Sequence, residues 1–231
     1  MTPVSDPNHQ PIVNPMPPVV IALFLFIAGI EAYFVLGTVG LIGDPSAIGW
    51  RLNAIQEYGL SPNVIHWMVD NNIYPIEHVK RLLTFSFVNG STISAAVAIA
   101  LLLALGRMVG SIFSAVSLLV VYFGAAVGGA VVFAYAAPQN EWLFGSYVGV
   151  YGLIGAYSYI NWLVLRAEHA PQYRAFSLIA MLMGVQLLFG MFFSVGYTWI
   201  ADLAAFAVGF VLSFLVAPGG IMRLLRALRR D

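Results

Sequence analysis

The chain of 231 residues contains no cysteine and few charged residues. Without cysteine it forms no disulfide, no thiolate metal site and no cysteine nucleophile. Only 9% of the residues are charged while 61% are hydrophobic, which leaves too little polar surface to cover a soluble globule. Ten basic residues balance ten acidic ones, so the net charge is zero and a nucleic-acid partner is not expected.

Histidine is also scarce, which limits the chemistry open to the chain. The four histidines, His9, His66, His78 and His169, all lie outside the long apolar runs. A serine nucleophile needs a base within hydrogen-bond reach, and no histidine is placed to act as one inside an apolar run. We expect no metal ion and no other cofactor.

Six long apolar runs take up most of the chain. A helix needs about 20 apolar residues to cross a hydrocarbon core of ~30 Å. Six segments meet this requirement: roughly residues 19–42, 82–105, 112–136, 144–165, 175–195 and 199–216. The first run follows a tail without Lys or Arg and is too long for the apolar part of a signal peptide, so we expect it to be retained. The sequence therefore predicts an all-α, multi-pass protein of the lipid bilayer.

The basic residues predict how the chain is oriented, because cytoplasmic loops carry an excess of Lys and Arg. Six spans would leave both termini on one side of the membrane. The other side holds only Arg51, Lys80 and Arg81, whereas the side of the termini holds Arg107, Arg166, Arg174, Arg223, Arg226, Arg229 and Arg230. We expect both termini to be cytoplasmic, in a membrane of the bacterial inner-membrane type.

Three further segments flank or interrupt the spans. Residues 1–18 hold six prolines, which predicts a disordered tail before a transmembrane domain at 19–217. Residues 43–80 alternate aromatic and charged side chains, as segments at the headgroup level do, and we expect one or two short helices there. Residues 218–231 place leucines on one helix face and arginines on the other, which predicts an amphipathic segment at the membrane surface.

Small residues recur along two of the runs. Helices in lipid associate by close van der Waals contact, which small residues on one face permit. The residues concerned are Gly145, Gly149, Gly152 and Gly155 in the fourth run, and Ala205 and Gly209 in the sixth. Taken singly, each pair is explained by general helix packing.

Two of these segments resemble the catalytic helices of the rhomboid intramembrane proteases. Residues 145–156 are similar to the family's serine helix, G-x-S-G-x-x-x-G-x-x-G, but Tyr147 stands at the position of the nucleophile. Residues 201–209 resemble the last core helix of the family, with Asp202 at the position of the catalytic histidine.

A third segment resembles the start of the second rhomboid span, where histidine and asparagine side chains donate hydrogen bonds to the oxyanion. In residues 87–98, Asn89 and Ser94 stand at the two histidine positions and Ala98 stands at the asparagine position. The resemblance thus covers the frame of the family, while every position that performs its chemistry differs.

The resemblance implies a bundle of six transmembrane helices with a long structured loop between the first two. It implies that the second, fourth and sixth spans converge, with the fourth in the centre. It also implies that Tyr147 faces Asp202, and we expect the phenol to donate a hydrogen bond to the carboxyl group and to fill the former substrate cavity. By analogy with rhomboid pseudoproteases, the protein would bind transmembrane helices of client proteins.

Two other functions stay open at this point. An active rhomboid-type protease could use the neighbouring Ser146 as an unorthodox nucleophile. A small proton-coupled carrier could use Glu31 and Asp202, the two ionisable residues inside the spans, because charges in a bilayer are costly and mark possible sites. For Glu31, a hydrogen bond between helices is the simpler expectation. For Asp202, a contact with a ligand or partner is the alternative to the bond with Tyr147.

Overall fold

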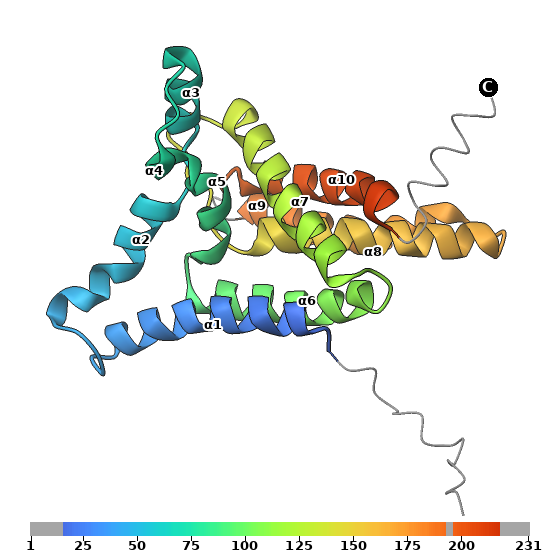
Figure 1. Cartoon of the computed structure of the whole chain (residues 1–231), viewed down its shortest axis with the longest axis horizontal. Helices are drawn as coiled ribbons and strands as arrows, with labels where there is room; N and C mark the ends of the chain where they lie inside the picture. Colours follow the sequence, from blue (N-terminus) through green and yellow to red (C-terminus); the bar gives the residue numbers. More distant parts are fainter. Residues whose placement is uncertain (1–15, 193–195, 218–231) are drawn as a thin grey trace, which may run out of the picture.

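The structure is a computed structural model, and it describes residues 16–192 and 196–217 (Figure 1). The described residues form helices and no strand beyond one isolated bridge between Leu60 and Leu143. Most of the expected tail at 1–18 and all of the amphipathic segment expected at 218–231 lie outside the described residues. Both therefore stay predictions.

Within the described residues, five helices are long and apolar enough to cross a membrane. They are α1 (Pro18–Thr38), α6 (Thr92–Gly110), α7 (Ala115–Ala136), α8 (Tyr147–Ala167) and α10 (Thr198–Val216). The span expected at 175–195 corresponds to α9 (Ser177–Phe192), which follows the short helix η3 (Gln172–Phe176). The described part of α9 has 16 residues, and residues 193–195 are not described, so a sixth crossing stays a prediction.

The second spanning helix begins later than the apolar pattern predicts. The run expected from residue 82 starts instead with α5 (Arg81–Thr84) and η2 (Phe85–Phe87), after which the backbone becomes extended at Val88. The helix α6 then begins at Thr92, because the side chain of Ser91 accepts a hydrogen bond of 3.2 Å from the backbone N–H of Ser94. A serine in this capping position satisfies one of the free N–H groups at a helix start.

The connection between α1 and α6 contains more short helices than expected. Within residues 43–80 the chain forms η1 (Pro45–Gly49), α2 (Trp50–Tyr58), α3 (Pro62–Asn71) and α4 (Ile76–Val79), where we expected one or two. Prolines occupy the first turns of η1 and α3, and Pro75 precedes α4. Proline suits a helix start but cannot continue a helix, so each proline opens a separate short one.

The helix α8 lies in the centre of the bundle and contacts α6, α7 and α10 (Figure 1). Every residue of α8 from Val148 to Ala156 is buried. Its glycines permit this crowding: a Cβ added at Gly155 would collide with the backbone of α10, and one added at Gly209 would collide with the backbone of Gly152. The small residues therefore bring two helix backbones together, as the spacing predicts.

Candidate functional site

Tyr147 and Asp202 line one cavity of about 700 Å³ near the same end of α8 and α10. Tyr147 is the first residue of α8 and is half-buried, whereas Asp202 lies on α10 with only 3% of its surface exposed. The expectation that the phenol fills the cavity is wrong, because the phenol forms part of the wall instead. The other lining residues are Ser94, Val97 and Leu101 of α6, residues 140–144, Val148 and Tyr151 of α8, Leu182, Val185 and Gln186 of α9, Gly196 and Thr198.

Asp202 does not form the expected hydrogen bond with Tyr147. Its Oδ2 instead accepts a hydrogen bond of 3.0 Å from the side-chain amide of Gln186, and Oε1 of Gln186 lies 3.5 Å from the hydroxyl of Tyr151. The other oxygen of Asp202, Oδ1, is buried without a partner among the described residues. The position of α9 beside α10 is the physical reason, since it brings the side-chain amide of Gln186 within hydrogen-bond distance of the carboxyl group.

Sequence reasoning missed Gln186. It is a polar side chain within the otherwise apolar run of α9. A polar side chain in a membrane span must find a partner inside the protein, because lipid offers none. That rule would have identified Gln186 as a candidate, although it would not have identified Asp202 as the partner.

Ser146 lies outside this cavity and is completely buried. Its backbone N–H donates to Oδ1 of Asn89 at 3.0 Å, and its hydroxyl accepts from the side-chain amide of Asn89 at 3.2 Å. The turn before it depends on Gly145, whose φ of +110° is a conformation that other residues rarely adopt. The two hydrogen bonds fasten the start of α8 to the segment that precedes α6.

The remaining oxyanion positions fall on α6. Ser94 lines the cavity and its backbone N–H is engaged by the cap at Ser91. Ala98 is completely buried and has no side-chain donor. The described histidines lie elsewhere: His66 is on α3 with its Nε2 3.0 Å from the carbonyl oxygen of Ala134, His78 is on α4, and His169 follows α8.

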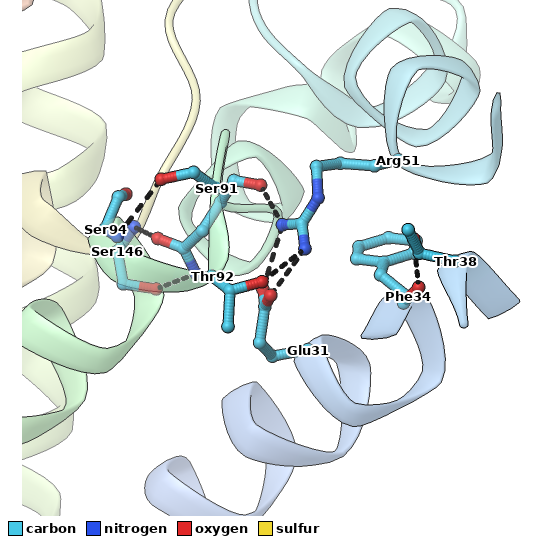
Figure 2. Close-up of polar contacts among 9 residues, drawn as sticks. Glu31, Phe34, Thr38, Arg51, Ser91, Thr92, Ser94 and Ser146 are labelled. Atoms are coloured by element: carbon cyan, nitrogen blue, oxygen red, sulfur yellow. Dashed lines mark hydrogen bonds and ion pairs between the residues drawn. The ribbon is translucent and has the colours of Figure 1, made fainter. Parts of the chain in front are cut away.

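Glu31 forms an ion pair with Arg51 of α2 (Figure 2). One nitrogen of the guanidinium group donates to Oε2 of Glu31 at 3.0 Å and to the carbonyl oxygen of Asn89 at 2.7 Å. Another lies 3.3 Å from the hydroxyl of Thr92, at the start of α6. The expected partner on another helix is therefore present, but it comes from the connection and not from a spanning helix. The contacts join α1, α2 and the start of α6.

The comparisons with known proteins agree with this geometry. Residues 77–219 match the family model of the Rhomboid domain, which covers α4 to the end of α10 and includes both Tyr147 and Asp202. Among curated proteins, none matches the chain. The matched residues make up more than half of the chain and contain four of the five candidate spans found in its described part. The protein is therefore an integral, multi-pass membrane protein that belongs to the rhomboid family.

Proposed function

We propose that this protein is a rhomboid pseudoprotease that binds transmembrane segments of client proteins. The observation that supports the proposal is the cavity of about 700 Å³, which has Tyr147 and Asp202 in its wall at the positions of the family's serine and histidine. A binding site is retained in this arrangement, while the residues that would cleave a peptide bond are absent.

The chemistry of the site argues against proteolysis. A phenol has a pKa near 10 and needs a base to become a nucleophile, but one oxygen of Asp202 already accepts a hydrogen bond from Gln186. The neighbouring Ser146 is buried outside the cavity, and its side chain is bonded to Asn89. Without a donor at Ala98 the oxyanion would lose support worth about 10²–10³ in rate. These features disfavour the alternative of a protease that uses Ser146.

The walls of the cavity favour a transmembrane helix as its occupant. Val97 of α6 and Val185 of α9 both line it, and their side chains are 46% and 45% exposed. In spanning helices, exposed side chains of this kind face lipid. An opening between α6 and α9 would let a helix enter from the bilayer. Packing against apolar side chains and hydrogen bonds to polar ones are what hold helices together in lipid.

The proposal includes six spans with both termini in the cytoplasm of a bacterial-type cell. With α9 counted as a sixth crossing, the number of crossings is even and both termini lie on one side. The excess of arginine between spans two and three, between spans four and five and after the last span supports this orientation. The carrier alternative is disfavoured because the carboxyl group of Glu31 is already paired with Arg51.

Cleavage assays test the absence of proteolysis. We expect the purified protein in lipid to leave model transmembrane substrates intact and to remain unlabelled by a serine-directed fluorophosphonate, while an active rhomboid tested in parallel cleaves and is labelled. Ser146→Ala should give the same result as the unchanged protein. Cleavage that disappears in Ser146→Ala would overturn the assignment and establish the unorthodox protease.

Site-specific photo-crosslinking tests the binding of helices. A photoreactive residue at Val97 or Val185 should crosslink a single-spanning Leu/Ala peptide reconstituted with the protein. The same residue at Val116, which is 70% exposed on α7 and does not line the cavity, is the matched control. Equal crosslinking at Val116 and Val185 would show that the peptide meets the bundle at random, and the proposal would fail.

A further inference from the structure

The cavity of Tyr147 and Asp202 has acidic and aromatic side chains, and no basic one is among the described residues that line it. Its two carboxyl groups belong to Asp202 of α10 and to Glu141, in the connection before α8. No ion pair involves either group among the described residues. Four rings share the wall with them: Trp142, Phe144, Tyr147 and Tyr151. Carboxylates and ring faces both attract cations, so the wall is complementary to a positive charge.

One oxygen of this wall lacks a hydrogen-bond partner. Asp202 is 97% buried, since only 3% of its surface is exposed, and its Oδ2 accepts from Gln186 at 3.0 Å. Its Oδ1 is buried and has no partner among the described residues. Buried polar atoms in native proteins are nearly always paired, and an unpaired one calls for an explanation. Asp202 also lines the cavity, so a donor that enters the cavity comes next to this carboxyl group.

We propose that the cavity recognises client transmembrane segments that carry a lysine or arginine, whose cationic group pairs with the carboxyl group of Asp202. This inference rests on the proposed function and names the class of client. A basic residue within a membrane span is costly unless it finds a partner, so clients of this kind gain most from an acidic cavity. The rings of Tyr147 and Tyr151 line the same cavity and attract the same charge.

The position of Asp202 suits a side chain that reaches in from a neighbouring helix. Asp202 follows the first residue of α10 by four positions, which places it about 6 Å along the helix axis from Thr198. The long stems of lysine and arginine pack along apolar surface while they carry their charge to such a polar group. The cavity volume of about 700 Å³ lies within the range of small-molecule pockets, so the cavity has room for more than one side chain.

The amine of a phospholipid headgroup fits this wall less well. In a zwitterionic lipid the amine is joined to a phosphate, so an amine at Asp202 would bring a negative group into a cavity that already contains Glu141. No basic side chain among the described lining residues is present to receive that phosphate. A basic residue on an apolar helix brings the positive charge alone.

Binding of two matched peptides tests the inference. The full-length protein is placed in phosphatidylcholine nanodiscs, and a fluorescent Leu/Ala spanning peptide carries one Lys about one turn inside its apolar stretch. The second peptide has Met in place of Lys. We expect the Lys peptide to bind about tenfold more tightly, which corresponds to about 1.4 kcal/mol. In Asp202→Asn the affinity for the Lys peptide should fall to that for the Met peptide.

Two further variants sharpen the test. Glu141→Gln should reduce the preference for the Lys peptide by less than Asp202→Asn does, because Glu141 is the more exposed of the two acids. Asp70→Asn, at an exposed acid of α3 outside the cavity, should leave both affinities unchanged. A retained thermal transition in Asp202→Asn shows that this variant is folded.

Each other outcome has a defined meaning. Equal binding of both peptides to the unchanged protein overturns the preference for a basic residue and leaves the proposed function standing. Binding of neither peptide overturns the proposed function itself. An unaltered preference in Asp202→Asn overturns the assignment of Asp202. If phosphatidylethanolamine in the nanodisc displaces the Lys peptide and Asp202→Asn prevents this, the site takes a lipid amine and the assignment to a client helix is wrong.

Discussion

At the scale of single residues, three pairs of polar side chains join different elements of the structure. Glu31 meets Arg51, Asn89 meets Ser146 and Gln186 meets Asp202. Each pair joins two different elements, so each fixes their relative position. The side chains of Glu31 and Arg51 are 10% and 20% exposed, which makes their pair the best shielded of the two described ion pairs.

Removal of one partner from this pair should destabilise the protein. We expect Glu31→Gln to lower the free energy of unfolding by about 1–3 kcal/mol, because the guanidinium group of Arg51 stays partly buried without its counter-charge. Unfolding in lipid–detergent mixtures with increasing SDS measures the change. The matched control is Glu57→Gln, whose pair with Lys80 spans 3.7 Å at the exposed surface and should matter by less than about 1 kcal/mol. Equal effects of the two substitutions would contradict the prediction.

At the scale of the helices, the close contact of α8 with its neighbours depends on glycines, which have no side chain. A Cβ added at Gly152 would collide with Ala125 of α7, and one added at Gly209 would collide with Gly152. A closely packed interior has no room for an added methyl group at these positions unless the backbone moves. The contact of α8 with α7 and α10 is therefore more sensitive to size than to polarity.

Substitution of glycine by alanine should separate crowded from open positions. Gly209→Ala is expected to lower the free energy of unfolding by about 1–3 kcal/mol through overpacking. Gly29→Ala in α1 meets no atom within 4 Å, so it should leave stability unchanged or raise it by about 0.5–1 kcal/mol through the better helix propensity of alanine. SDS-unfolding curves of the two variants provide the comparison, and a loss of stability in Gly29→Ala as large as that in Gly209→Ala would refute it.

The helices were more predictable than the site. The bilayer thickness sets a length that the apolar runs at α1, α7, α8 and α10 meet, so composition located these helices closely. The start of α6 was predicted too early, because the apolar run already includes the residues before Val88. The helix itself begins only after its N-terminal cap at Ser91. The open cavity and the bond of Asp202 to Gln186 depend on where α9 packs against α10. That arrangement is a tertiary property, which the local pattern of neither helix contains.

At the scale of the whole molecule, the connection between α1 and α6 lies at one end of the bundle (Figure 1). Its helices α2 and α3 are joined to that end by the ion pair of Arg51 and by the contact of His66 with the carbonyl oxygen of Ala134. The opposite end holds the turn between α6 and α7 and the turn after α8. In a bilayer crossed by the candidate spans, the two ends would face different sides.

The absence of cysteine makes the orientation directly measurable. A single cysteine at Asp70, exposed on α3, should react with a membrane-impermeant maleimide in intact cells, because we expect this end outside the cytoplasm. A cysteine at Glu168, exposed after α8, should react only after the membrane is opened. The unchanged chain is the blank, since it has no thiol to react. Labelling of Glu168→Cys but not Asp70→Cys in intact cells would reverse the topology.

The ion pair of Glu31 also has a consequence for biosynthesis. The carboxyl group leaves the ribosome with α1, whereas Arg51 follows with α2 and the other acceptors of its guanidinium group, Asn89 and Thr92, arrive only with the start of α6. We therefore expect that, when α1 first enters the membrane, the carboxyl group of Glu31 has no counter-charge, because Arg51 has not yet arrived. A truncated, released chain that ends before residue 51 should insert poorly into the membrane, and one that extends through α6 should insert fully.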